Sequence, residues 1–354
     1  MLSKEEAIKQ FDPNGSGIAG NLFGLPFTEE HAEILILPIP WEVTVSYHTG
    51  TAKGPQAILD ASSQLDLYVK DIPDAWKMGV CMLPIPQELQ SESKKLRDMT
   101  TMHVSRSKKN EMVDTEDPLL KTINEAGENL NIYVKSATQK LLKAGKLVGL
   151  VGGEHSVPLG FLRALSEQYD RFGILQLDAH ADLRKAYQGL TYSHASIMYN
   201  ALKLPAVGRI VQVAVRDYCE EEVSVIQRAM GRVMMFTDEE IKEKTFNGRT
   251  WDSICDDIIK QLPEFVYISF DIDGLDPKLC PDTGTPVAGG LEFQQSMHLI
   301  KKLVYSGRKI IGFDLCEVSP GRDDWDANVG ARVLFNLCNW MAVSRGRLKV
   351  VTGK

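Results

Sequence analysis

The stretch that decides the fold is LQLDAHAD, residues 175–182, in which an apolar run is followed by an ionisable residue at every second position. The apolar run begins upstream as FGILQL and predicts a buried strand. Side chains of an extended chain alternate between its two sides, so Asp178, His180 and Asp182 would face one point in space if the strand conformation persists. Burying three ionisable groups is costly unless they are paired or bind a metal.

Similar short runs rich in Val, Ile and Leu recur along the chain: AEILILPIP, LVGLVG, IVQVAVR, VMMFT, FVYISFD and KIIGFD. Helical patterns such as PLGFLRALSEQY and TWDSICDDIIKQL separate most of them. Continuous apolar runs are typical of strands covered on both faces, and their alternation with helices favours a parallel sheet. The sequence therefore predicts an α/β fold, a single three-layer domain over residues 1–354 with a mostly parallel central sheet and helices on both faces.

One segment departs from this alternation. Residues 84–116 are polar and poorly periodic, and we interpret them as an insertion or a loosely packed excursion. A long amphipathic helix is predicted directly after them, over residues 118–144, with Leu119, Ile123, Leu130 and Val134 near one face.

Composition excludes several functions. The chain has 354 residues, 44% of them hydrophobic, and a net charge of −7, which argues against a nucleic-acid partner. No apolar run approaches the roughly 18 residues of a membrane span, so no membrane association is predicted. The six cysteines are scattered, which indicates reduced thiols rather than a disulfide framework. A cytoplasmic protein is the expectation.

Polar residues follow three further strand-like runs. His155 comes after LVGLV within GGEHS, Asp271 and Asp273 come after FVYISF, and Glu317 follows KIIGFDLC. Because the carboxyl ends of parallel strands form the ligand crevice of an open α/β sheet, we expect these groups to meet at one edge.

Six of these side chains form the predicted metal site. Four close carboxylates would repel one another and some would take up protons, but two divalent cations would balance their charge. A lone DxD is common in surface loops, whereas the three motifs together leave that interpretation little room. Oxygen-rich ligation with two imidazoles suits Mn²⁺, although Ni²⁺, Co²⁺ or Zn²⁺ could occupy the same geometry. The predicted ligands are His155, Asp178, His180, Asp182, Asp271 and Asp273.

The motifs GGEHS, DAHADLR, SFDIDGLDP with TGTPVAGGL, and GFDLCEVSP resemble, in order and spacing, those of the arginase/agmatinase (ureohydrolase) family. The resemblance runs over residues 34–337 and is closer to agmatinases than to arginases. It implies two manganese ions per subunit. His155, Asp178, Asp182 and Asp271 would hold one ion; His180, Asp178, Asp271 and Asp273 would hold the other.

The resemblance also implies a reaction. A hydroxide between the two metals would attack the guanidinium carbon of a small cationic substrate and release urea. Glu317 would pair with the guanidinium through two parallel hydrogen bonds, and His194 would deliver a proton to the leaving amine. Ser269 would orient a metal ligand from behind. Trp41 and His48 lie in a loop that approaches the active-site mouth in this family, so either could touch substrate.

Agmatine is the leading substrate. The loop 183–193 lacks the SGN element with which arginases hold an amino acid's α-carboxylate, which argues against arginine. Free guanidine, guanidinobutyrate and guanidinopropionate stay open, and formiminoglutamate is less favoured. The segment SPGRDDWDANVGARV departs from the family pattern and puts the substrate in doubt. A metal-binding member without catalysis is the alternative class, and a homo-oligomer, trimer or hexamer, is expected.

Overall fold

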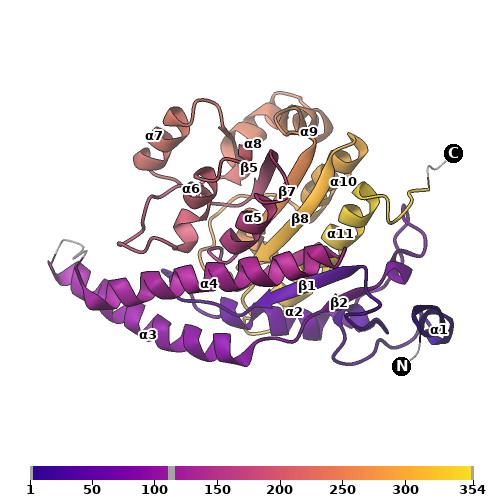
Figure 1. Cartoon of the computed structure of the whole chain (residues 1–354). Helices are drawn as coiled ribbons and strands as arrows, with labels where there is room; N and C mark the ends of the chain where they lie inside the picture. The colour runs from indigo at the N-terminus through magenta and orange to yellow at the C-terminus, as the bar shows by residue number, and fades with distance from the viewer. Residues whose placement is uncertain (1–2, 111–115, 352–354) are drawn as a thin grey trace.

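The computed structural model describes residues 3–110 and 116–351, and in it eight strands form one parallel sheet (Figure 1). The strand order across the sheet is β2-β1-β3-β8-β7-β4-β5-β6. The strands are β1 (Ile34–Ile39), β2 (Val80–Met82), β3 (Leu147–Gly152), β4 (Phe172–Leu177), β5 (Val207–Val215), β6 (Val233–Thr237), β7 (Phe265–Asp271) and β8 (Lys309–Cys316). The predicted α/β class and parallel sheet are confirmed.

Helices cover both faces of this sheet (Figure 1). The α-helices are α1 (Lys4–Gln10), α2 (Gly54–Ser62), α3 (Gln87–Asn110), α4 (Pro118–Lys143), α5 (Leu159–Leu165), α6 (Ile197–Leu202), α7 (Glu220–Arg228), α8 (Asp238–Phe246), α9 (Trp251–Lys260), α10 (Phe293–Tyr305) and α11 (Trp325–Ser344). The 3-10 turns are η1 (Leu22–Gly24), η2 (Thr51–Lys53), η3 (Ala75–Met78), η4 (His194–Ser196), η5 (Ile272–Gly274) and η6 (Pro277–Leu279). Because both faces are covered, strand residues such as Leu177, Phe270 and Phe313 are fully buried.

The strand order brings the polar motifs together. β3, β8, β7 and β4 are consecutive in the sheet although the chain visits them as β3, β4, β7 and β8. All are parallel, so their carboxyl ends lie at the same edge: Leu150 pairs with Asp314, Ser269 also pairs with Asp314, and Leu177 pairs with Phe270. Each motif singled out in the sequence thus leaves the sheet beside another.

Residues 84–116 are not the loosely packed excursion that their irregular pattern suggested. Most of them form α3, which lies alongside α4 (Figure 1). The buried positions on α3 are Ser93, Leu96, Thr100 and His103, a spacing that marks one helical face. Only Leu96 among them is a large apolar residue, so a hydrophobic pattern could not reveal the helix. Residues 111–115 lie outside the described residues, and whether the segment is an insertion stays a prediction.

The long helix after this segment matches its prediction over 118–144. Asp117 caps it by accepting a hydrogen bond from the Leu119 N–H, and Pro118 occupies the first turn, where a missing N–H costs nothing. Ile123, Leu130 and Val134 are buried on its inner face. Across the two described ranges, no helix has the length and apolarity needed to cross a membrane.

Candidate metal centre and active site

The first candidate ligand, His155, leaves the end of β3 through a tight turn. A side chain at Gly153 would place its Cβ 1.9 Å from the Trp41 carbonyl oxygen, so only glycine fits there. The turn is held by backbone hydrogen bonds from Gly153 to Ile39 and from Glu154 to Trp41. His155 follows with 1% exposure of its side chain.

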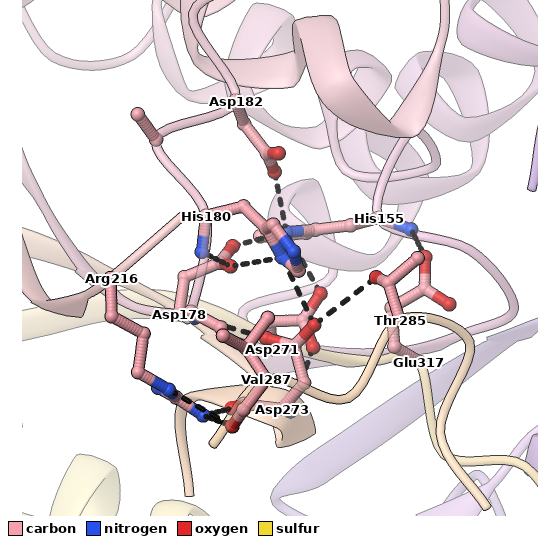
Figure 2. Close-up of polar contacts among 12 residues, drawn as sticks. His155, Asp178, His180, Asp182, Arg216, Asp271, Asp273, Thr285, Val287 and Glu317 are labelled. Carbon is pink, nitrogen blue, oxygen red and sulfur yellow. Dashed lines mark hydrogen bonds and ion pairs between the residues drawn. The ribbon is translucent and has the colours of Figure 1, made fainter. Parts of the chain in front are cut away.

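The DAHAD motif converges as predicted, but by a different route. β4 ends at Leu177, so the extended conformation does not persist through Asp182. Instead Asp182 has a φ of 54°, a conformation that non-glycine residues adopt rarely and that is concentrated at functional sites. This turn directs its carboxylate back toward His155, as Figure 2 shows.

Three carboxylates surround one nitrogen of His155. Its Nδ1 lies 2.9 Å from Asp178 Oδ2, 3.0 Å from Asp182 Oδ2 and 3.2 Å from Asp271 Oδ2 (Figure 2). Adjacent ligands of an octahedral ion bound at about 2.1 Å lie about 3.0 Å apart, so the spacing suits a common metal. Although buried, Nδ1 makes no hydrogen bond of acceptable geometry to any described residue.

The contacts of Nε2, on the opposite side of the His155 imidazole, explain why Nδ1 makes no hydrogen bond. Ser269 Oγ donates a hydrogen bond to Asp314 Oδ2 at 2.9 Å and lies 2.8 Å from His155 Nε2. Since the hydroxyl proton of Ser269 is committed to Asp314, its oxygen accepts from the Nε2–H of His155. The neutral tautomer therefore presents Nδ1 as a bare lone pair to three anionic oxygens, an arrangement that a cation satisfies.

A second cluster adjoins the first. His180 Nδ1 lies 3.1 Å from Asp273 Oδ2 and 3.5 Å from Asp178 Oδ1. The two oxygens of Asp178 thus face different imidazoles, which is the geometry of a bridging ligand. Two groups able to hold a metal ion emerge, His155 with Asp178 and Asp271, and Asp178 with His180 and Asp273. The six predicted ligands are brought together, and Asp182 joins the first group through its contact with His155.

The shifted pKa values of this cluster indicate that its members require a compensating positive charge. Burial, followed by the charge of Asp178, raises the pKa of Asp182 to about 7. Burial and the neighbouring carboxylates of Asp273 and Asp178 hold the pKa of Asp271 well above its ordinary value. The pKa of His155 is raised in spite of burial, because Asp178, Asp182 and Asp271 surround it. Burial and like charges therefore make this group of carboxylates costly without positive charge, which divalent cations would supply.

Glu317 lies beside the cluster at the end of β8. Its Oε1 accepts a hydrogen bond from the His155 N–H at 2.8 Å, whereas its buried Oε2 has no hydrogen-bond partner among the described residues. Its φ of 62° is again that of a strained functional position. Burial raises its pKa well above the ordinary value, and the charges of Glu154 and Asp273 contribute. A cation placed at Oε2 would satisfy this carboxylate.

His194 begins η4, and a threonine fixes its ring. Thr44 Oγ1 donates to Glu154 Oε1 at 2.9 Å, so its oxygen accepts from the His194 N–H at 3.0 Å and from Nδ1–H at 3.1 Å. Nε2 is left as the nitrogen able to exchange a proton. Burial lowers the pKa of His194 to about 3, helped by the positive charges of His180, His155 and Arg97, so the ring is neutral at neutral pH.

A cavity of about 270 Å³ reaches the site at three of its residues. It is lined by His180, Asp182 and His194 together with residues of four segments: Ser46, Tyr47, Arg184, Tyr187, Ala195, Asp217, Glu222, Thr285, Pro286 and Val287. The loop predicted to approach the site does so, but through Ser46 and Tyr47. Trp41 is 2% exposed and belongs to the hydrophobic core. His48 stacks on Tyr47 with ring centroids 4.2 Å apart.

Sequence reasoning missed the residues that hold this site from behind. Glu154 accepts hydrogen bonds from the N–H groups of Val43, Thr44 and Val45. Gln176, a polar residue inside a buried strand, donates to Asp178 Oδ2 at 2.8 Å. Its position alone was a signal, because a buried amide needs a partner.

Arg216 is a further missed residue. Its guanidinium donates to the carbonyl oxygens of Asp273, Leu275 and Val287 and ties a ligand segment to the cavity wall (Figure 2).

Comparison with known proteins matches residues 32–339 to the arginase family. An N(1)-aminopropylagmatine ureohydrolase of Thermus thermophilus is 28% identical over 321 residues, 90% of this chain and 94% of that protein. An agmatinase of Neisseria meningitidis is 28% identical over 313 residues, 87% of each chain. The structure of an agmatine ureohydrolase of Thermoplasma volcanium superimposes with a TM-score of 0.68 at 25% identity, over 95% of this chain and 97% of that one.

Proposed function

Because the chain belongs to the arginase family, whose members hydrolyse guanidino C–N bonds, we propose that it is an agmatinase-like ureohydrolase. Its proposed reaction converts agmatine, or a close relative such as N(1)-aminopropylagmatine, to urea and an amine. The observation that carries this proposal is the buried Oε2 of Glu317, without a hydrogen-bond partner among the described residues, beside five side chains that could hold metal ions and Asp182, which contacts His155.

The cofactor of this proposal is a pair of divalent ions, Mn²⁺ first, with Ni²⁺, Co²⁺ or Zn²⁺ possible in the same oxygen-rich geometry. Two features support a pair of ions: the Nδ1 lone pair of His155, and the carboxylate of Asp178, whose two oxygens face different imidazoles. When bound, such ions lower the pKa of water and so supply a nucleophilic hydroxide near neutral pH. Ser269 would keep His155 in the tautomer that the first ion needs.

Glu317 would bind the substrate's guanidinium. A guanidinium offers parallel N–H donors, and a carboxylate accepts them in a fixed plane, which orients the carbon for attack. Oε2 is free for this bond, and Oε1 keeps the carboxylate in place through the His155 N–H. The cation would also return Glu317, whose pKa is raised by burial, to its ionised form.

His194 would move the proton. Because its pKa is lowered to about 3, the ring is neutral when substrate binds and must accept a proton before it can donate one. Nε2 would take the proton released as water adds to the guanidinium carbon. It would then pass that proton to the leaving nitrogen as the C–N bond breaks.

Agmatine leads as substrate because a carboxylate lines the cavity, beside Arg184, whose guanidinium lies over the Tyr187 ring. Asp217 lines the cavity and is exposed, so a cationic tail would meet a carboxylate there. The relatives named agmatinase and N(1)-aminopropylagmatine ureohydrolase favour the same class. A homo-oligomer, trimer or hexamer, and a cytoplasmic location stay predictions.

The test is a substrate panel with urea detection on the metal-loaded protein. We expect urea from agmatine or N(1)-aminopropylagmatine at a higher kcat/KM than from arginine, guanidinobutyrate or free guanidine. Glu317→Gln is the matched control, because it keeps the volume of the side chain. Protein that binds two ions per chain but releases no urea from any of these compounds would instead be a metal-binding family member without catalysis.

A further inference from the structure

Helix α3, which sequence reasoning did not detect, reaches the site from outside the sheet. Ser93 Oγ accepts a hydrogen bond from the Glu42 N–H at 2.7 Å. One turn further, Arg97 Nη1 donates to the Val45 carbonyl oxygen and lies 3.5 Å from that of Val43. Two residues of one helix face thus hold both the N–H groups and the carbonyls of the loop 41–50.

That loop carries the contact to His194. Glu154, which follows β3, accepts from three of its N–H groups, while Arg97 of α3 donates to its carbonyls. Thr44 lies between Val43 and Val45 and accepts hydrogen bonds from the N–H and the Nδ1–H of His194. The ring orientation of His194 therefore depends on a backbone segment that both Glu154 and α3 hold in place.

The same helix also grips the second loop of the cavity. His103, fully buried, lies with Nε2 3.0 Å from the Gln188 carbonyl oxygen and with Nδ1 2.8 Å from Asp117 Oδ2. Gln188 has a φ of 54° in the loop 183–193, directly after the cavity residue Tyr187 and shortly before His194.

Helix α4 adds to the hold on this second loop. Asn124 donates to the Gly189 carbonyl oxygen at 3.1 Å and accepts from the Thr191 N–H at 2.8 Å. The loop 183–193 is thus fixed by both members of the α3–α4 pair.

Arg97 contributes charge as well as hydrogen bonds. Its guanidinium is half-buried, and its positive charge helps, after burial and the two histidines, to lower the pKa of His194. It also acts to lower the pKa of Glu154, whose net pKa is raised by burial. The helix is therefore coupled to the site electrostatically as well as mechanically.

We propose that α3 is a positioning element of the active site. Through Ser93, Arg97 and His103 it sets the two loops that orient His194 and shape the cavity wall. The inference rests on the proposed function only in assigning His194 a proton-transfer role. The contacts themselves predict that loop order, proton transfer and substrate binding depend on three residues that touch neither metal nor substrate.

The experiment uses full-length, metal-loaded protein and pairs each variant with a control on the same helix. Arg97→Met is matched by Lys94→Met, and His103→Gln by Met102→Gln, since Lys94 and Met102 are exposed. For the first member of each pair we expect hydrogen exchange in 41–50 and 183–193 to become at least threefold faster. We also expect about a tenfold loss of kcat/KM, as for one lost hydrogen bond, with unchanged metal content. Arg97→Lys, which restores a donor, should recover part of kcat.

The outcomes separate the two claims. If wild type releases no urea, the proposed function fails. Hydrogen exchange then still tests whether α3 orders the two loops. If Arg97→Met and His103→Gln leave loop exchange at the wild-type rate, or speed it without changing kcat or KM, α3 does not position the site. If either variant loses protection from hydrogen exchange throughout the sheet, Ser93→Ala replaces it. This variant removes one hydrogen bond and must speed hydrogen exchange in 41–50. Exchange there at the wild-type rate would refute the proposal.

Discussion

The strand-end cluster and helix α3 hold the same site by opposite means. The cluster places ionisable residues at or directly after the ends of four neighbouring strands, so each of its motifs stands beside an apolar run in the sequence. Helix α3 acts through Ser93, Arg97 and His103, which stand beside no apolar run and whose partners in the two loops lie 51 to 85 residues away in the chain. The comparison teaches that the groups that do chemistry can be marked in the sequence by an adjoining apolar run, whereas the groups that aim them carry no such mark.

The largest expected effect comes from removing a charge in the cluster. Asp178→Asn keeps the shape of the side chain but takes one anion from between the two imidazoles. We expect a loss in kcat/KM of about 1,000-fold or more, because breaking a buried charge pair costs about 3–5 kcal/mol. Bound metal should fall below two ions per chain by elemental analysis. Asp276→Asn, an acid of the GLDP turn outside the cluster, is the control and should keep both. Full metal and activity in Asp178→Asn would remove this residue from the site.

Glu317→Gln separates substrate binding from metal binding within the same edge of the sheet. The amide retains an oxygen to accept the His155 N–H but cannot carry the negative charge that pairs with a guanidinium. A loss of about 100-fold in kcat/KM follows from a charge-assisted hydrogen bond worth about 3 kcal/mol. Metal content should equal that of wild type; a variant that instead loses metal would show that Glu317 supports the ions rather than the substrate.

His194 links the two regions, and its lowered pKa makes a prediction about acid stability. Its pKa is about 3 in the folded protein and 6.5 when exposed, so the unfolded chain binds the extra proton as pH falls below 6.5. Between pH 7.5 and 5 this costs the folded state about 2 kcal/mol, or about 30-fold in the folding equilibrium.

Denaturant unfolding of metal-free protein at pH 7.5 and 5.0 measures the effect of His194 on acid stability. Wild type should lose about 2 kcal/mol more than His194→Gln, in which this group is absent. Metal-free protein is used so that acid cannot act by releasing ions. Equal losses in the two proteins would mean that His194 is not held neutral by its surroundings.

Thr44→Val gives the smallest effect and tests the contact through which the loop 41–50, held by α3, orients His194. Valine matches threonine in shape but cannot bond to Glu154 or His194. We expect kcat to fall about tenfold, as for about 1.5 kcal/mol of lost hydrogen bonding, with KM and metal content close to wild type. Thr49→Val, in the exposed part of the same loop, should behave as wild type. An effect confined to KM would show that the loop binds substrate but does not orient His194.

The ligand motifs could be predicted because parallel strands turn sequence position into spatial position. His155, Asp178, Asp271 and Glu317 each occupy the end of an apolar run or follow within a few residues, and sheet geometry does the rest. Asp182 meets His155 for a reason other than the one expected, since a left-handed turn and not a continued strand points it inward.

The supports behind the ligands could not be predicted in this way. The buried face of α3 consists largely of Ser, Thr and His, so it carries no hydrophobic period. Trp41 was expected to be able to contact substrate, but an aromatic next to a strand end more often fills the core, as it does here. Thr44 and Glu154 act only through contacts that the fold creates between distant segments.

The most direct test of the account is a titration of metal-free protein with Mn²⁺, followed by urea release from agmatine. If six side chains hold two ions that together activate water, activity should rise through the second equivalent and level off at two ions per chain. Urea release that is complete at one ion per chain, or that persists after all metal is removed, would contradict the two-metal site.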